Sequence, residues 1–290
     1  MNYETLINAA ELQAALGRPQ LVILDCRFDL AAPQAGRQAY LEGHIATARH
    51  ADLNADLSAP VSATSGRHPL PDPQRLAARF GAFGIGPETQ VVAYDAANGA
   101  FAARAWWLLH WLGHSKAAVL DGGWAAWRSA GGAVAAGEPD AATPGAAAHR
   151  GDAPFVPRVR PDAVVSTAQL IEALAQPGHL LVDARAAERF AGTVEPIDPI
   201  AGHVPGAVNH PFSANLGTDG HFLARDELRR RWRARLAGTA PENLIAMCGS
   251  GVTACHHLLA LEVAGLDGAK LYAGSWSEWI RDPARPVARG

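Results

Sequence analysis

One cysteine stands in a setting that suits nucleophilic chemistry. Cys248 follows the apolar run LIAM and opens the segment CGSGVTA, which leads into an apolar helical pattern that ends at Gly265. Gly249 and Gly251 permit positive φ, so this loop can curl with its N–H groups toward the sulfur. The start of the following helix adds partial positive charge at the same place. The setting predicts a stabilised thiolate, which is the form in which cysteine acts as a nucleophile.

An ordinary buried thiol is the alternative interpretation for each cysteine. Cys26 lies in a strand pattern and Cys255 on the apolar face of the helix after Cys248, so both are expected in the core. The three cysteines cannot all pair, and their spacing fits no zinc motif. His256 and His257 are adjacent on a helix and are expected to point in different directions, which argues against a shared metal. The sequence predicts one reactive thiol and no metal site.

The elements around Cys248 belong to the second of two copies of one pattern. Five landmarks recur in the same order at nearly constant offset, which indicates a repeated fold. The pairs are Asn8 and Ser166, Asp25 and Asp183, His44 and His203, Asp95 and Cys248, and Trp124 and Trp276. Each copy alternates helical and apolar strand patterns, so the predicted fold class is α/β, with two tandem domains that each hold a parallel sheet flanked by helices. Ligands of such sheets bind beyond the carboxyl ends of the strands, where Cys248 is placed.

Length and composition agree with two globular domains. The chain has 290 residues, and the predicted boundaries are 1–135 for the first domain, 136–160 for an Ala-, Gly- and Pro-rich linker, and 161–290 for the second. A formal charge of −3 argues against nucleic acid as a partner. The most apolar stretch, AFAARAWWLLHWLG, is too short to cross a membrane, and the N-terminus does not read as a signal peptide. A cytoplasmic protein is expected.

The loop CGSGVTA and the later segment YAGSWSEW resemble the catalytic loop and C-terminal signature of the tandem rhodaneses, most closely those that use 3-mercaptopyruvate. GHVPGAVN and the DxR motifs of both halves extend the resemblance over essentially the whole chain. It implies a sulfurtransferase that carries sulfur as a Cys248 persulfide to a thiophilic acceptor such as cyanide or a thiol, with a thioredoxin-like reductant as a further partner. It also implies an inactive first domain, with Asp95 in the cysteine position, and no metal or organic cofactor. The residues implied as the persulfide cradle are Gly249, Ser250, Gly251, Val252 and Thr253.

In the family that the chain resembles, the charge of the residues after the cysteine indicates which sulfur donor is used. Enzymes of this kind that are specialised for thiosulfate place basic side chains after the cysteine, whereas Gly249 and Ser250 are neutral, so 3-mercaptopyruvate is favoured. Two arginines would hold its carboxylate. Arg189 in ARAAERF matches the first, but the second motif reads EPI, with Ile197 in the arginine position. A thiosulfate-specific enzyme therefore stays open as an alternative.

A loop of the first half supplies further candidates. The segment SGRHPLP resembles the family loop that reaches the active cysteine, which implies His68 near the site and Arg67 as a partial replacement for the missing guanidinium. Asp56 is the candidate for an acidic residue that supports them. A solvent-exposed loop histidine is an equally weighted interpretation of His68.

Two functions of other classes remain as alternatives. A cysteine phosphatase of this fold needs an arginine six residues after the cysteine to bind phosphoryl oxygens, and Ala254 stands there. A non-catalytic persulfide carrier or regulatory module would keep Cys248 but act only with protein partners. Turnover with a small donor and free cyanide separates an enzyme from such a carrier.

Overall fold

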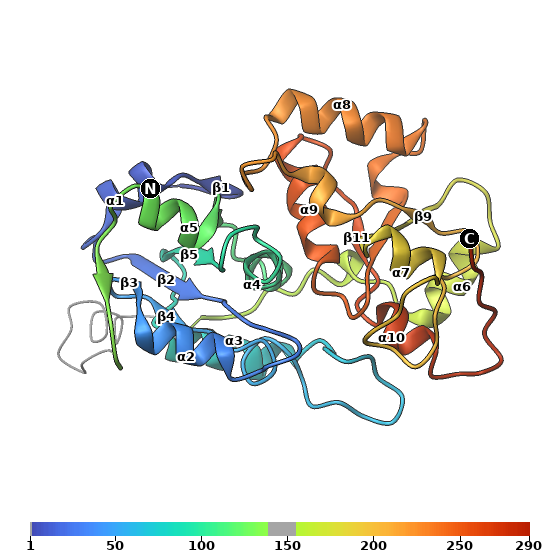
Figure 1. Ribbon diagram of the computed structural model, residues 1–290, viewed down its shortest axis with the longest axis horizontal. Helices are drawn as coiled ribbons and strands as arrows, with labels where there is room; N and C mark the ends of the chain where they lie inside the picture. The colour runs from blue at the N-terminus through green and yellow to red at the C-terminus, as the bar shows by residue number, and fades with distance from the viewer. Residues whose placement is uncertain (1, 139–154) are drawn as a thin grey trace. The chain divides into compact units, whose positions relative to one another are not determined.

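The computed structural model describes residues 2–138 and 155–290 (Figure 1). Most of the predicted linker, residues 139–154, lies outside the described residues. The chain divides into an N-terminal unit of residues 1–59, 71–160 and 218–221 and a C-terminal unit of residues 60–70, 161–217 and 222–290. The loop 60–70 therefore groups with the C-terminal unit, although the sequence places it inside the first copy. None of the helices in the described parts is long and apolar enough to cross a membrane.

The N-terminal unit is built on a sheet of five parallel strands, as its alternating pattern predicts. In spatial order they are β1 (Leu6–Ile7), β6 (Ala117–Leu120), β5 (Gln90–Tyr94), β2 (Leu21–Asp25) and β4 (Arg49–His50). Two short antiparallel strands, β3 (His44–Ile45) and β7 (Val134–Ala135), pair separately. The helices of this unit are α1 (Ala9–Ala15), α2 (Ala35–Glu42), α3 (Pro73–Ala82), α4 (Ala102–Trp111) and α5 (Gly123–Ser129).

The C-terminal unit repeats this plan with four parallel strands. Their spatial order is β11 (Lys270–Leu271), β10 (Leu244–Met247), β8 (Leu180–Asp183) and β9 (Val208–Asn209). Its helices are α6 (Thr167–Leu174), α7 (Ala187–Ala191), α8 (Arg225–Leu236), α9 (Ala254–Val263) and α10 (Ser275–Trp279), with 3₁₀ turns at Pro161–Ala163, Phe212–Asn215 and Pro241–Asn243. A parallel bridge from Val164 to Leu271 stands where β1 pairs with β6 in the first unit. The predicted tandem α/β fold is confirmed.

Local sequence signals start equivalent helices in the two units. The Asn8 side chain accepts the backbone N–H of Glu11 at 2.9 Å, and the Glu11 carboxylate accepts the N–H of Asn8 at 3.0 Å. Ser166 and Gln169 form the same reciprocal pair at α6. Such capping satisfies otherwise unpaired amides and stabilises a helix by about 1 kcal/mol.

The DxR motifs fix the ends of the central strands in both units by the same buried contacts. Each arginine donates to the motif aspartate and to a glycine carbonyl, and lies 4.8 Å from the centre of a tryptophan ring. The sets are Arg27 with Asp25, Gly43 and Trp124, and Arg185 with Asp183, Gly202 and Trp276. Removing one partner of such a buried pair is strongly destabilising, so these residues hold structure.

A buried polar cluster supports α9, the helix that follows the Cys248 loop. The Asn215 amide nitrogen lies 3.2 Å and 3.0 Å from the Nδ1 atoms of His256 and His257, so the expectation that these histidines point apart is wrong. His257 Nε2 donates to the His210 carbonyl at 2.7 Å. With Nδ1 as acceptor and Nε2 as donor, His257 is held neutral, and burial keeps its pKa well below the ordinary value.

Because this cluster holds buried neutral histidines, we expect the free energy of unfolding to fall in acid. Burial, aided by the charge of Arg235, lowers the pKa of His210 from 6.5 to about 4. Between these values the unfolded chain binds more protons than the native one, so this contribution is complete above pH 6.5 and is lost as the pH falls toward 4. His210→Phe, which keeps an aromatic ring beside Trp232, should remove up to about 3 kcal/mol of the pH dependence of unfolding. Denaturant titrations from pH 7.5 to 4 test this, and identical slopes for both proteins would contradict it.

Candidate active site

Cys248 lies directly after β10, where the loop curls back on its sulfur. The Cys248 side chain is buried, with 2 % exposed, and the Gly251 N–H donates to Sγ at 3.1 Å. Gly251 has a φ of 79°, and a Cβ there would collide with the Ala273 carbonyl. The Cys248 N–H donates to Ser275 Oγ at 3.1 Å, which ties the loop to α10. A backbone donor therefore faces the sulfur, as the glycine pattern predicts.

The other predicted cradle residues shape the loop around this contact. Val252 is buried and its carbonyl accepts the N–H of Cys255, while Thr253 immediately precedes α9. The Gly249 carbonyl accepts the N–H of Ser277 at 2.9 Å. Among the described residues, Gly251 is the cradle residue that donates a hydrogen bond to Sγ.

His68 and Ser250 form a close pair in the C-terminal unit. His68 Nδ1 lies 2.7 Å from Ser250 Oγ, and both side chains are buried. The interpretation of His68 as a solvent-exposed histidine is therefore wrong. The loop that carries His68 is fixed to α10, because the Arg67 N–H donates to Ser277 Oγ at 3.0 Å and a Cβ at Gly66 would lie 2.6 Å from the Gly274 carbonyl. This pair can pass a proton to or from a group bound beside Cys248.

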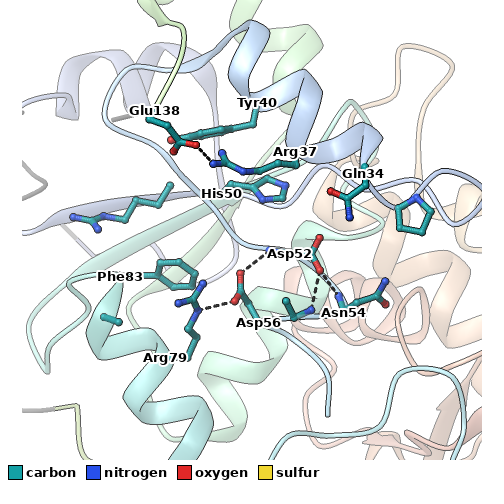
Figure 2. A pocket seen from close by; sticks show the side chains of 14 residues that line it. Gln34, Arg37, Tyr40, His50, Asp52, Asn54, Asp56, Arg79, Phe83 and Glu138 are labelled. Carbon is teal, nitrogen blue, oxygen red and sulfur yellow. Dashed lines mark hydrogen bonds and ion pairs between the residues drawn. The ribbon is translucent and has the colours of Figure 1, made fainter. Parts of the chain in front are cut away.

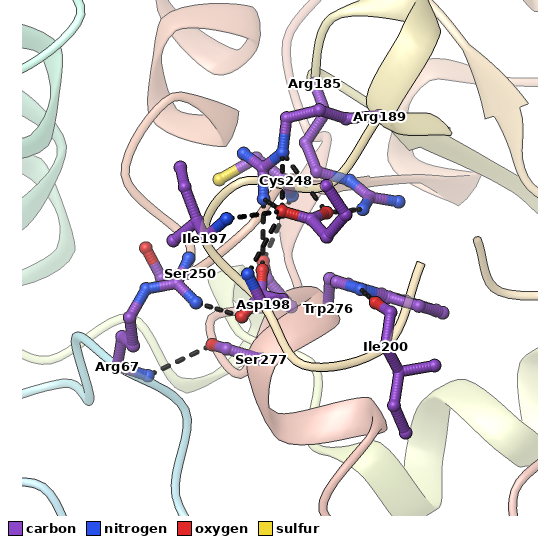
Figure 3. A network of polar contacts seen from close by, with 12 residues as sticks. Arg67, Arg185, Arg189, Ile197, Asp198, Ile200, Cys248, Ser250, Trp276 and Ser277 are labelled. Carbon is purple, nitrogen blue, oxygen red and sulfur yellow. Dashed lines mark hydrogen bonds and ion pairs between the residues drawn. The ribbon is translucent and has the colours of Figure 1, made fainter. Parts of the chain in front are cut away.

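Two guanidinium groups lie beside the loop. A Cβ built on Gly249 would be 3.0 Å from an Arg67 terminal nitrogen and 3.6 Å from one of Arg189. Asp198 joins the two arginines: it pairs with Arg67 and accepts from Arg189 at 3.0 Å (Figure 3). Arg189 also donates to Glu195 at 3.0 Å and 2.8 Å. The site thus presents donors suited to an anion such as a carboxylate.

The two acids respond differently to this environment. Burial raises the pKa of Asp198, and the charge and hydrogen bond of Arg67 only partly offset it. Burial also acts to raise the pKa of Glu195, but hydrogen bonds from Arg189 and from two backbone N–H groups outweigh it, so this pKa is lowered. Sequence reasoning missed both acids. The available signal was the motif EPID itself, in which acidic residues flank the missing arginine.

Ile197 stands where the resemblance implies the second arginine that would hold the substrate carboxylate. Its side chain is 41 % exposed, and its N–H donates to Glu195 at 3.1 Å. Arg67, which the sequence offers as a partial replacement, lies beside Gly249 together with Arg189. The structure therefore places two guanidinium groups at the loop without an arginine at position 197.

Asp56 belongs to the N-terminal unit, where it has other partners. Its carboxylate pairs with Arg79 at 2.6 Å and accepts the Asp52 N–H at 2.8 Å. It lines a cavity of about 660 Å³ in that unit, together with Tyr40 and His50 (Figure 2). Its support of the cysteine site stays a prediction.

Asp95 occupies the cysteine position of the N-terminal unit. Its buried carboxylate accepts backbone N–H groups of the loop that follows β5, at 2.8 to 3.3 Å. The donors are Ala97, Gly99, Phe101 and Ala102. This loop encloses a carboxylate, which cannot carry sulfur as a persulfide. The inactivity of the first domain stays a prediction.

Comparisons with known proteins agree with the repeated fold. A Pseudomonas aeruginosa protein provisionally named a 3-mercaptopyruvate sulfurtransferase is 51 % identical over 100 % of both chains. A Mycobacterium tuberculosis protein provisionally named thiosulfate sulfurtransferase SseB is 41 % identical over 99 % of this chain and 98 % of its own. The solved 3-mercaptopyruvate sulfurtransferase from Leishmania major is similar with a TM-score of 0.82 and 32 % identity, over 95 % of this chain and 74 % of that one. The model of the rhodanese-like domain matches residues 8–130 and 166–282, and the chain therefore belongs to the rhodanese family, with one such domain in each half.

Proposed function

We propose that this chain is a sulfurtransferase that takes sulfur from 3-mercaptopyruvate, holds it as a persulfide on Cys248 and passes it to a thiophilic acceptor. The observation that carries the proposal is the Gly251 N–H directed at Cys248 Sγ, with Arg67 and Arg189 beside the same loop. A backbone donor stabilises a thiolate, and paired guanidinium groups hold a carboxylate.

The proposed reaction has two transfers. The Cys248 thiolate attacks the donor sulfur, the carbon–sulfur bond breaks, and its electron pair stays on carbon as the enolate of pyruvate. The proton of the donor thiol stays on the outer sulfur of the new persulfide and then passes through Ser250 and His68 to the enolate. This transfer gives pyruvate and leaves the persulfide as its anion. An acceptor thiolate then attacks the outer sulfur of the persulfide, becomes a persulfide itself and returns Cys248 as thiolate. No external oxidant or reductant is needed for these two steps.

The acceptor and the compartment are parts of the proposal. Cyanide or a small thiol can receive the sulfur, and a thioredoxin-like reductant is a candidate protein partner. All three cysteines are free and buried, which suits the reducing cytoplasm. A phosphatase is disfavoured because Ala254, buried at the start of α9, cannot bind phosphoryl oxygens. A carrier without turnover would give no thiocyanate from a small donor and cyanide.

Donor kinetics test this function. We expect activity with both 3-mercaptopyruvate and thiosulfate, with a higher kcat/KM for 3-mercaptopyruvate. Ile197→Arg adds a charge-assisted contact worth about 1.5–3 kcal/mol and should raise that preference by on the order of tenfold or more. Arg189→Ala should weaken 3-mercaptopyruvate use chiefly through KM.

Thiosulfate specificity is the second candidate, favoured by the name of the Mycobacterium tuberculosis relative. Steady-state assays with each donor, and cyanide as the common acceptor, separate the two. A clear thiosulfate preference that Ile197→Arg leaves unchanged would overturn the assignment of 3-mercaptopyruvate.

A further inference from the structure

Asp198 is the carboxylate that the two guanidinium groups share. Its side chain is 2 % exposed, compared with 26 % for Arg67 and 17 % for Arg189. It contacts one terminal nitrogen of Arg67, and the other terminal nitrogen faces Gly249. The buried Nε of Arg67 has no hydrogen-bond partner among the described residues. Asp198 thus orients Arg67 so that the other terminal nitrogen of Arg67 can donate a hydrogen bond next to the cysteine loop.

We propose that Asp198 is a specificity-determining positioning residue, which holds Arg67 and Arg189 and sets the charge beside Cys248 to favour donors with one negative charge over donors with two. This inference rests on the proposed function and adds the basis of donor choice. In the resemblance, donor choice depends on basic side chains directly after the cysteine. Here it depends on an acidic side chain, Asp198, which lies next to two arginines.

The charges near the loop support this assignment. Arg67 and Arg189 contribute two positive charges, and Asp198 and Glu195 contribute two negative charges, so the group is neutral overall. Glu195 also faces Arg185 at 3.5 Å, so part of its charge is taken up by the buried DxR motif. Removal of the Asp198 charge leaves one uncompensated positive charge. Thiosulfate carries two negative charges and 3-mercaptopyruvate one, so the dianion gains more from that change.

The test compares kcat/KM for thiosulfate with kcat/KM for 3-mercaptopyruvate in matched variants. Asp198→Asn should raise this ratio on the order of tenfold, since one unit charge at several ångströms is a sizeable interaction even at an effective dielectric constant of about 20. Thiosulfate use by this variant should also fall more steeply with ionic strength. Asp198→Glu keeps the charge and should keep the wild-type ratio. Glu188→Gln is the control and should keep the wild-type ratio, because Glu188 is an exposed acid next to Arg189 in sequence.

A second charge change keeps the test decisive if Asp198→Asn does not fold. Arg67→Gln changes the charge in the opposite direction and should lower the ratio, and the double variant Arg67→Gln with Asp198→Asn should return toward the wild-type ratio. An unchanged ratio in a folded Asp198→Asn variant, or in Arg67→Gln where Asp198→Asn does not fold, would overturn the role of Asp198. Failure of the proposed function is distinguishable, because the wild-type protein would then gain no sulfur on Cys248 from either donor in an intact-mass measurement.

Discussion

Cys248→Ser should reduce sulfur transfer from 3-mercaptopyruvate to cyanide by at least about a thousandfold, as expected when a covalent nucleophile is removed. A serine hydroxyl is a much weaker nucleophile and cannot form a persulfide. The fold should be retained, because the loop is held by backbone contacts to Ser275 and Trp276 that do not use the sulfur. Initial rates of thiocyanate formation, with circular dichroism as a check of folding, measure the effect.

The other two cysteines provide matched controls. Burial, reinforced by the charge of Asp25, holds the pKa of Cys26 well above its usual range, so this thiol is a poor nucleophile. Cys255 Sγ donates to the Gly251 carbonyl at 3.3 Å, a bond that a serine hydroxyl can replace. Cys26→Ser and Cys255→Ser should therefore keep most of the activity. Full loss in either variant, with the fold intact, would show that Cys248 is not the sole reactive thiol.

Gly251→Val should lower kcat/KM by about a hundredfold or more, the usual cost of losing a backbone donor at a reacting centre. Valine disfavours the φ of 79°, and its Cβ would collide with the Ala273 carbonyl, so the loop must move and the N–H contact to Cys248 is lost. Alkylation of Cys248 by iodoacetamide at pH 7 should slow in parallel.

Gly178 offers a control for backbone strain alone. It has a φ of 94° in the same unit, but a Cβ there meets nothing within 4 Å. Gly178→Val should cost about 1–2 kcal/mol of stability through the left-handed conformation and leave kcat/KM unchanged. Equal alkylation rates in wild type and Gly251→Val would rule out the loop amide as the source of cysteine reactivity.

Much of the fold is encoded in local patterns and could be predicted from the sequence. The caps Asn8 and Ser166 act over three residues, and the apolar runs LVIL and LIAM become buried strands because each is apolar on both faces. The positions of Asp95 and Cys248 followed from the repeat. The grouping of loop 60–70 with the C-terminal unit could not be predicted in this way, because it depends on contacts such as Arg67 with Ser277 across 210 positions.

In the site too, features encoded locally could be predicted from the sequence, and features that depend on long-range contacts could not. Gly251 signalled its own conformation, since glycine is the residue that tolerates positive φ at low cost. Asp198 gave no comparable signal, because its role depends on two arginines that meet only in three dimensions, one of them 131 positions away. Asn215 was missed for the same reason, as its amide joins His256 and His257 from a distant turn.

The most direct test of the central claim is intact-mass analysis with peptide mapping after one equivalent of 3-mercaptopyruvate is added without an acceptor. We predict that the protein gains the mass of one sulfur atom, that the added sulfur maps to Cys248, and that one equivalent of pyruvate is released. Cyanide should then remove the added sulfur as thiocyanate. Pyruvate release without added mass, or sulfur carried on Cys26 or Cys255 while Cys248 stays unmodified, would contradict the persulfide account.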